Sequence, residues 1–420
     1  MHFLIETFGC KVNAYQSAGM RQALEARGYT PSPPGGQAGL VLVNTCTVTA
    51  RAVARCRQAI RRLRRDHPGA RVVVVGCETA ADPAGLAAMP EIDAILPYDA
   101  KYWLPEALEG GPRPAVVDLF PFHDVVLADH TRGFVQVADG CNAHCTYCII
   151  PRIRGPLQSR PLEAILSEAA NLIRLGRREI VLTGIHTGAY GRDTGNASLA
   201  DVIAGILKPP GEYRVRLSSI EIQEVDDRLL DLMAADPRIC PHLAIPLQSG
   251  SDPILKAMNR TYTAETYLAG IDAIRRRLPE CAVTTDIICG FPGETDDDHA
   301  ATLRVAAMAG FGRIHAFIYS RRPGTPAADM PGQIPSRVKT DRFRSMTALG
   351  HSLAADFARS FIGRTVRVIP EGKVKTAGTL HGYTEHYIPA TFDGPPDLIG
   401  RIIPVRATAA KGETLICERM

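Results

Sequence analysis

The chain has 420 residues, enough for two or three domains with separate hydrophobic cores. Its 45% apolar and 22% charged residues are typical of a globular protein, and the net charge of +4 permits nucleic-acid binding without predicting it. No apolar run reaches the roughly 18 residues that a membrane span needs, and the first residues resemble a strand rather than a signal peptide. Eleven cysteines without a secreted-type framework indicate a reducing compartment, so we expect a cytoplasmic protein.

Residues 1–120 are predicted to alternate between strands and helices. Strands are expected at 3–7, 40–44 and 71–76, each followed by a helix. The second of these is wholly apolar, as in a parallel strand covered on both faces. The alternation predicts a doubly wound α/β domain, with a linker after it at 121–131.

A cysteine follows each of these three strands, at Cys10, Cys46 and Cys77. Ligand sites in open parallel sheets lie beyond the carboxyl ends of the strands, so we expect the three thiols to converge on one rim. Three converging thiolates can hold three irons of a cubane cluster and leave the fourth iron open. The alternative is three unrelated buried cysteines. Cys56 lies mid-helix and is expected to be a small buried residue.

A second group of cysteines follows the predicted strand at 133–137. Cys141, Cys145 and Cys148 have x3 and x2 spacing in one short loop, which also suits three irons of a cubane. The alternatives are structural zinc and three unrelated buried thiols. Zinc needs a fourth nearby ligand, for which His144 inside the loop is the candidate.

The remaining chain is predicted to form two further domains. Residues 132–360 contain six strand–helix units, too few for a closed eight-stranded barrel, so we expect an open partial barrel with functional residues at the strand C-termini. Residues 361–420 contain five short strands and predict a small OB-like barrel. The six barrel strands are expected at 133–137, 178–183, 213–218, 242–247, 282–288 and 313–319. The five C-terminal strands are expected at 365–369, 376–380, 386–389, 402–406 and 414–418.

Several motifs resemble known families. The CxxxCxxC loop resembles the radical S-adenosylmethionine (SAM) signature. The segments Gly-Cys-Lys-Val-Asn at 9–13, Val-Asn-Thr-Cys-Thr-Val-Thr at 43–49 and Val-Gly-Cys at 75–77, together with that loop, resemble the methylthiotransferase family over essentially the whole chain. The first two resemble its tRNA threonylcarbamoyladenosine (t6A) branch. The C-terminal barrel resembles a TRAM domain, an RNA-binding module, with a structural cap as the alternative.

This resemblance implies an enzyme that methylthiolates C2 of N6-threonylcarbamoyladenosine at position 37 of tRNA, next to the anticodon, giving 2-methylthio-N6-threonylcarbamoyladenosine. The isopentenyladenosine branch would have Gly-Cys-Gln-Met-Asn in the first motif, and the branch that modifies a ribosomal-protein aspartate would have Gly-Cys-Pro-Lys-Asn. Those two substrates remain alternatives. A non-catalytic iron–sulfur RNA-binding protein is a third.

The resemblance also implies cofactors and site residues. It implies two [4Fe-4S] clusters, one on Cys10, Cys46 and Cys77 and one on the loop cysteines, with SAM at the second. The residues that would contact SAM are Tyr147, Thr183, Gly184, Glu221 and Gln248.

Some residues leave the site open to interpretation. Packing is an equal alternative for Tyr147. A surface position is expected for Arg260, with contact to a carboxylate of SAM or substrate as the alternative. Ile222 and Ala244 depart from the family pattern, which has proline and histidine there. No general base is identified.

The expected partners are a tRNA anticodon stem-loop and a flavodoxin-like or ferredoxin-like electron donor. The sulfur donor is not indicated, no membrane is involved, and a monomer is expected. A helix rich in arginine between Arg51 and Arg65 either follows a phosphate backbone or forms a solvated face.

Overall fold

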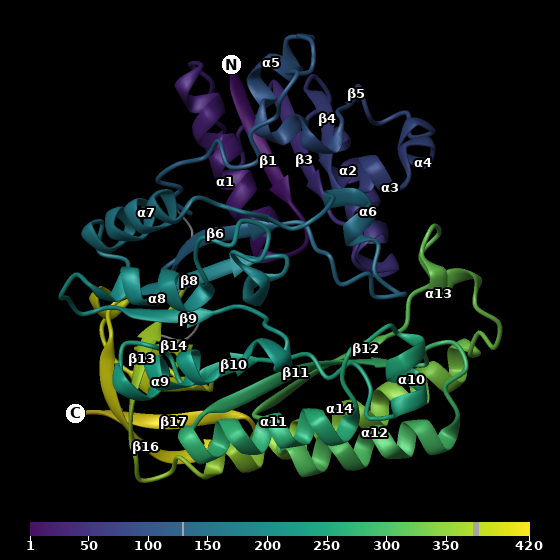
Figure 1. Cartoon of the computed structure of the whole chain (residues 1–420). Coiled ribbons are helices and arrows are strands. Elements are labelled where there is room, and N and C mark those ends of the chain that lie inside the picture. The colour runs from purple at the N-terminus through teal and green to yellow at the C-terminus, as the bar shows by residue number, and fades with distance from the viewer. Residues whose placement is uncertain (128–129, 373–377) are drawn as a thin grey trace.

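The computed structural model describes residues 1–127, 130–372 and 378–420. It has an N-terminal α/β part, a central open sheet covered by helices, and a C-terminal β-barrel packed against the end of the central sheet (Figure 1). The predicted fold class is thereby confirmed. The exact domain limits at residues 120, 131 and 360 stay predictions.

The N-terminal part is built on a five-stranded parallel sheet in the order β2-β1-β3-β4-β5. The central strand β3 is buried along its whole length, and β4 is buried after its first residue, because helices cover both faces of the sheet. The strands are β1 (His2–Thr7), β2 (Thr30–Pro31), β3 (Leu40–Thr45), β4 (Arg71–Gly76) and β5 (Ala94–Ile95).

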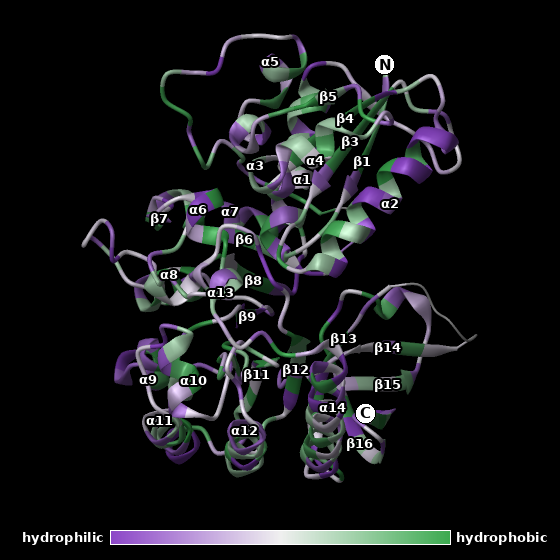
Figure 2. Cartoon of the chain, turned by 90° about the vertical axis from the view of Figure 1, so that its right-hand side faces the viewer, coloured by the Kyte–Doolittle hydropathy of each residue, from purple (hydrophilic) through white to green (hydrophobic). Residues whose placement is uncertain are grey.

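The helices of this part differ in how they face solvent. α2 buries only a narrow stripe, and Figure 2 shows its hydrophilic side turned away from the mostly hydrophobic β3 and β4. Thr49 caps α2 by accepting a hydrogen bond from the backbone N–H of Ala52. The helices are α1 (Lys11–Ala26), α2 (Ala50–Asp66), α3 (Cys77–Ala81), α4 (Pro83–Ala87), the 3-10 helix η1 (Tyr98–Tyr102) and α5 (Leu104–Leu108).

The central part contains the six parallel strands expected of an open barrel. They form two sheets, β7-β6-β8-β9 and β10-β11-β12, which isolated bridges between Val215 and Ile239 and between Ser219 and Ala244 connect. The short β7 is antiparallel and was not predicted. The strands are β6 (Gly133–Asp139), β7 (Gln158–Ser159), β8 (Glu179–Gly184), β9 (Arg214–Leu217), β10 (His242–Ala244), β11 (Ala282–Cys289) and β12 (Arg313–Ile318).

Helices alternate with these strands and cover the outside of the sheet (Figure 1). Their apolar sides and the strands form the largest hydrophobic core of the chain. The helices are α6 (Ile150–Arg154), α7 (Leu162–Arg174), η2 (Thr187–Ala189), α8 (Leu199–Leu207), η3 (Ile222–Glu224), α9 (Asp227–Ala235), α10 (Asp252–Ala257), α11 (Ala264–Arg277), α12 (Asp296–Ala309), α13 (Pro326–Asp329) and α14 (Ser336–Arg359).

The C-terminal strands close into a barrel in the order β13-β14-β15-β17-β16. The prediction for the third strand was displaced: residues 384–388 form a turn in which Tyr387 has a φ of 63°, so β15 begins only after it. The second predicted strand lies partly outside the described residues. The elements are β13 (Thr365–Pro370), β14 (Thr379–Tyr383), β15 (Pro389–Asp393), the 3-10 helix η4 (Pro396–Leu398), β16 (Ile403–Lys411) and β17 (Thr414–Arg419).

A buried ion-pair network fixes this barrel to the central sheet. The Glu179 carboxylate lies 2.6 Å from Arg214 Nε and 2.8 Å from Arg216 Nε, and all three side chains are 1% exposed. The two guanidinium groups also donate to backbone carbonyls of the C-terminal barrel, at residues 367, 383, 384 and 385. The barrel is therefore held by rigid, charge-assisted hydrogen bonds.

The N-terminal part is fixed to the central part through α1. The Tyr15 hydroxyl lies 3.0 Å from both carboxylate oxygens of Glu168 on α7, and Arg160 pairs with the same carboxylate. The predicted linker is not an extended tether, because its residues Phe122 and Val125 are buried in the N-terminal core.

Candidate functional site

The N-terminal cysteines lie at one end of the parallel sheet. Cys46 and Cys77 each directly follow one member of the register pair Thr45–Gly76 on β3 and β4. Neighbouring strands are about 4.8 Å apart, so the two cysteines leave the sheet side by side. Cys10 follows β1, which pairs with the other side of β3.

The chain approaches itself closely at this end. Gly9 has a φ of 105°, and a Cβ atom added there would lie 2.8 Å from Cys46 Sγ, so only glycine fits. Burial raises the pKa of Cys46 to about 11, and the neighbouring thiols of Cys77 and Cys10 act in the same direction. The three thiols are therefore neighbours, as the strand-end rule predicted; their role as cluster ligands stays a prediction.

The loop cysteines lie just beyond the carboxyl end of β6. The backbone N–H of Cys148 donates to the carbonyl of Cys145 at 3.0 Å, and His144 adopts a φ of 49°, so the loop is tightly turned. Burial raises the pKa of Cys148 to about 12, with further contributions from Cys145 and Cys141. These three thiols also form one group.

A cubane cluster and a single zinc ion differ in how far apart they hold their cysteine ligands. Among the described residues, no three His, Cys, Asp or Glu side chains are placed to hold a single metal ion. A cubane binds each thiolate through a different iron, so its cysteines are farther apart than the ligands of one zinc ion.

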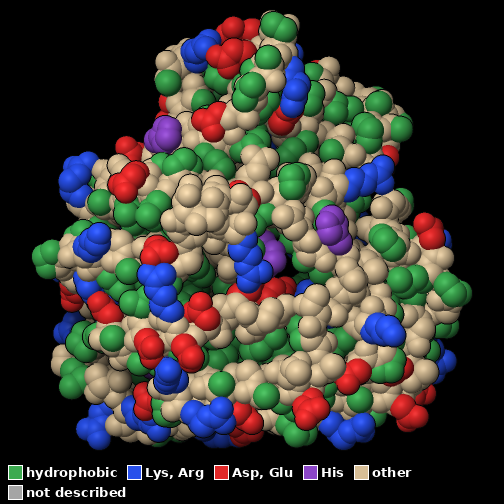
Figure 3. Space-filling view, viewed as in Figure 1, with side chains coloured by type: hydrophobic (Ala, Val, Ile, Leu, Met, Phe, Trp, Pro, Cys, Tyr) green, Lys and Arg blue, Asp and Glu red, His purple; other side chains and the backbone are tan. Residues whose placement is uncertain are grey.

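The two groups of cysteines meet across a short stretch of chain. Cys77 packs against Ile149 and Ile153, on the segment that directly follows Cys148. A cavity of about 210 Å³ opens between the segment that follows Cys46 and the loop that contains Cys148. Its lining includes Val48 and Thr49 after Cys46, Cys148 itself, and Gln248, Asp286 and Arg322 from the central part. In the space-filling view, a hollow edged by basic, acidic and histidine side chains opens near the middle of the molecule (Figure 3).

Arg154 connects the two groups. Its Nη2 lies 3.6 Å from Cys77 Sγ and 2.7 Å from Asn13 Oδ1, and its Nη1 lies 2.9 Å from Asp139 Oδ1. The Arg154–Asp139 pair is 1% exposed on both sides. Burial opposes the charge of Asp139, but the Arg154 guanidinium outweighs it and holds the pKa of this carboxyl below its usual range. No local motif pointed to Arg154, because its partners come from distant segments.

Arg322 is a second cation near the N-terminal cysteines. It is 7% exposed, and its Nε and Nη2 atoms have no hydrogen-bond partner among the described residues. Burial lowers its pKa, and the thiol of Cys46 is the first group that counters this effect. An unpartnered buried guanidinium is costly, so its position fits a bound anionic group such as a thiolate-ligated cluster.

Another cavity, of about 230 Å³, lies on the other side of the loop cysteines. Arg260 Nη1 donates to Cys145 Sγ at 3.3 Å, and Arg260 also forms an ion pair with Glu221. The expectation that Arg260 lies at the surface was wrong, because its side chain turns inward to these two partners and is only 5% exposed. Glu221, a predicted SAM contact, lines this cavity.

His186 also lines this cavity, and no sequence motif identified it as a functional residue. Its Nδ1 lies 3.5 Å from Cys141 Sγ and its Nε2 lies 2.8 Å from Glu224 Oε1. Burial alone would lower the pKa of His186, but the hydrogen bonds to Cys141 and Glu224 raise it to about 10. A charged imidazole beside Cys141 stabilises a thiolate there.

The other predicted SAM residues lie at the same strand ends. Gln248 lines the cavity of about 210 Å³ and has a φ of 62°. Tyr147 lines that cavity too, and packs against a small core that contains Phe291 and Tyr319. Thr183 and Gly184 end β8; Thr183 is 1% exposed, and neither residue lines these two cavities. Contact of all four with SAM stays a prediction.

One of the two departures from the family pattern, Ile222, has a structural explanation. Ile222 begins the 3-10 turn η3, which a capping box between Glu221 and Glu224 closes without proline. Its side chain packs against Gly270, where a Cβ atom would lie 2.6 Å from Ile222 Cγ1. Ala244 ends β10 and pairs in register with Thr284.

The arginine-rich face of α2 is largely engaged in ion pairs. Arg57 pairs with Glu78 and Asp82, while Arg62 pairs with Glu6. Arg61 and Arg64 also lie within ion-pair distance of acidic residues. This pattern favours a solvated, salt-bridged surface over a phosphate track for these four arginines.

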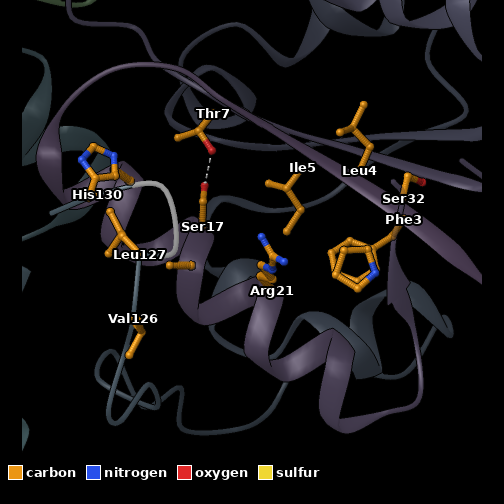
Figure 4. Close-up of a pocket in the computed structure, with 13 residues that line it drawn as sticks. Phe3, Leu4, Ile5, Thr7, Ser17, Arg21, Ser32, Val126, Leu127 and His130 are labelled. Atoms are coloured by element: carbon orange, nitrogen blue, oxygen red, sulfur yellow. Dashed lines mark hydrogen bonds between the residues drawn. The ribbon is translucent and has the colours of Figure 1, made fainter. Parts of the chain in front are cut away.

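A cavity of about 330 Å³ on the other side of the N-terminal domain belongs to neither site. It lies between β1 and α1, and Figure 4 shows the hydrogen bond between Thr7 and Ser17 beside it. None of the six cysteines lines it.

Comparison with known proteins agrees with this architecture. Residues 2–97 match the uncharacterized protein family UPF0004, residues 135–306 the Radical SAM superfamily and residues 359–418 the TRAM domain. Among solved structures, the radical SAM methyltransferase TsrM from Kitasatospora setae aligns with a TM-score of 0.58 at 17% identity, over 78% of this chain and 75% of that one. This likeness supports the fold.

Full-length relatives are closer in sequence. The threonylcarbamoyladenosine tRNA methylthiotransferase MtaB of Thermotoga maritima is 37% identical over 99% of this chain and 96% of its own length. The Bacillus subtilis protein of the same name is 35% identical over 96% and 93%. The tRNA-2-methylthio-N(6)-dimethylallyladenosine synthase of Carboxydothermus hydrogenoformans is 34% identical over 97% of both. The chain therefore belongs to the radical SAM methylthiotransferase family, whose enzymes use S-adenosylmethionine and iron–sulfur clusters.

Proposed function

We propose that this enzyme attaches a methylthio group to C2 of N6-threonylcarbamoyladenosine at position 37 of tRNA. The observation that carries the proposal is the pair of three-cysteine groups, whose segments contact each other where Cys77 packs against Ile149, beside the cavity that Cys148 lines. The relatives named for threonylcarbamoyladenosine, at 35–37% identity, support the choice of substrate.

We assign one [4Fe-4S] cluster to Cys10, Cys46 and Cys77 and the other to Cys141, Cys145 and Cys148. The C2–H bond of adenine is unactivated, and the bound cofactors supply the one-electron chemistry that functionalises it. The protein's own part is to hold the two groups of thiolates close together. Arg154, Arg322, Arg260 and His186 place positive charge next to them.

The two cavities suggest different roles for the side chains that line them. Glu221 and Arg260, which line the cavity beside Cys145, would bind the charged ends of SAM. Gln248, with both a donor and an acceptor, faces the cavity of about 210 Å³, where a purine edge would be held. The hydrophobic side chains of Ile288 and Phe317 in the same lining exclude water from the reacting atoms.

The proposed substrate also implies which RNA and protein partners the enzyme binds. An adenosine beside the anticodon lies in a single-stranded loop, whose bases can be splayed out into a cavity. The C-terminal barrel would contact the RNA, and a flavodoxin-like or ferredoxin-like protein would supply electrons. We propose a cytoplasmic monomer; in the described part of the chain, no helix has the length and apolarity to cross a membrane.

The test uses anaerobically reconstituted enzyme with SAM, a reductant and a sulfide source. Anticodon stem-loops carrying threonylcarbamoyladenosine or isopentenyladenosine at position 37 are compared by mass spectrometry of their nucleosides. A mass increase equal to one methylthio group on the first RNA supports the proposal. Modification of the second RNA alone would instead support the isopentenyladenosine reaction, which the 34% identical relative favours.

A further inference from the structure

The side chain of Lys11 extends from the N-terminal domain to the carboxyl ends of the strands in the central sheet. It is the first residue of α1, directly after Cys10. Its Nζ lies 3.5 Å from the hydroxyl of Ser218, just beyond the carboxyl end of β9. One residue therefore connects the N-terminal cysteine rim to the strand ends where the substrate would enter.

The Lys11 ammonium group has no anionic partner within the described residues. No carboxylate oxygen there lies within 4.0 Å of its Nζ, although the side chain is half-buried. The surrounding charges come from the central part and the C-terminal barrel. The charge of Lys11 acts to lower the pKa of Asp286 on β11 and of His315 on β12, although neither residue lies within ion-pair distance of it. Arg132 and Arg216 repel it, while Tyr387 attracts it. Partial burial of a cation in this setting costs free energy unless an anion that the protein itself does not supply pairs with it.

The other cations near the site already have partners or face thiols. Arg154 is paired with Asp139, and Arg260 is paired with Glu221. Arg322 is held near the thiol of Cys46. Lys11 differs from them because it points to a neutral hydroxyl at the mouth of the sheet.

The substrate of the proposed function carries the matching charge. Its adenine ring is neutral, but the threonine attached through the carbamoyl group at N6 ends in a free carboxylate. Resting on the proposed function, we propose that Lys11 binds this carboxylate and so selects adenosines with an acidic N6 substituent. A charge-assisted hydrogen bond of this kind at a half-buried position orients the purine as well as binding it.

The experiment compares two stem-loop RNAs that differ only in this charge. One carries threonylcarbamoyladenosine, and the other carries its threoninamide analogue, in which the carboxylate is a neutral amide. Methylthiolation kcat/KM and RNA affinity, by fluorescence anisotropy, are measured for the wild-type enzyme, Lys11→Gln and Lys11→Arg. Lys208→Gln, at an exposed lysine that ends α8, is the matched control. Iron content is measured for every variant, because Lys11 adjoins Cys10.

We expect the wild type and Lys208→Gln to favour the acid RNA over the amide at least tenfold. Lys11→Gln should lose most of that preference, and Lys11→Arg should keep much of it. The acid-to-amide ratio is measured on one preparation, so partial loss of clusters cancels, and the anisotropy ratio serves if a variant is inactive. A wild type without preference, or a Lys11→Gln variant with the wild-type ratio, overturns the inference. A wild type that modifies neither RNA overturns the proposed function itself.

Discussion

Arg154 Nη2 lies 3.6 Å from Cys77 Sγ, although 77 residues separate the two in the chain. The guanidinium is fully buried and also pairs with Asp139, so it cannot move away from the thiol. A fixed positive charge next to a thiolate-ligated cluster stabilises its reduced, more negative form.

Arg154→Gln should therefore lower the midpoint potential of the cluster assigned to Cys10, Cys46 and Cys77, by on the order of tens of millivolts. The measurement is an EPR-monitored redox titration in a background where the three loop cysteines are alanine, so that only this cluster is present. Arg152→Gln, on the exposed side of the same helix, is the control. An unchanged potential at full iron content would show that Arg154 has only a structural role.

The two groups of cysteines should be separable by iron content. Replacing Cys10, Cys46 and Cys77 with alanine should remove about half of the iron and leave SAM cleavage intact, because each cubane holds four irons. Replacing the loop cysteines should remove a similar amount and abolish SAM cleavage. Cys56→Ala, which changes a buried thiol outside both groups, should affect neither. Equal losses from both triple variants in both assays would contradict the assignment.

Asp286 should make stability depend on pH. Burial, together with the charge of Glu221, raises the pKa of Asp286 to about 6. A raised carboxyl pKa means that the folded state binds the proton more tightly than the unfolded state does. The resulting stabilisation is complete below the ordinary pKa near 4 and is lost as the pH rises through about 6.

Asp286→Asn should therefore raise the free energy of unfolding at pH 8 by about 1–3 kcal/mol and flatten its pH dependence between about pH 4 and 6. Denaturant unfolding at several pH values measures this. Asp272→Asn, at an exposed position on α11, should leave the profile unchanged. If the wild type showed no extra stability at the acid end of this interval, the burial argument would fail.

Glu179 should be the most sensitive residue between the central sheet and the C-terminal barrel. Glu179→Gln leaves Arg214 and Arg216 buried without their counter-ion, which should cost about 3–5 kcal/mol. The expected readouts are a lower melting temperature and faster proteolysis between the two parts. Glu280→Gln, which removes an exposed partner of Arg364, should cost less than about 1 kcal/mol. Equal effects of the two variants would disprove the role of burial.

The sequence predicted the elements and their order because those depend on local patterns. The apolar run at Leu40–Thr45 and the cysteine directly after it were sufficient to place Cys46 at the rim of a parallel sheet. The third strand of the C-terminal barrel was misplaced, because residues 384–388 form a turn in which Tyr387 has a positive φ, and that backbone conformation has no strong residue signature.

The charged residues of the site were harder to predict. Arg260 looks like a surface residue, and its inward position depends on Glu221 and Cys145, which are 39 and 115 residues away. His186 follows the same rule, since Glu224 and Cys141 approach it only after folding. Pairings of this kind depend on tertiary distance, which a linear pattern does not contain.

The guanidinium groups of Arg214 and Arg216 leave the C-terminal barrel no hinge against the central sheet, since they hold its backbone by four carbonyls. An RNA stem bound by that barrel would therefore lie at a fixed distance from the cavity. The enzyme would then select its target nucleotide by the distance of that nucleotide from the stem. The length of the loop would matter more than its sequence.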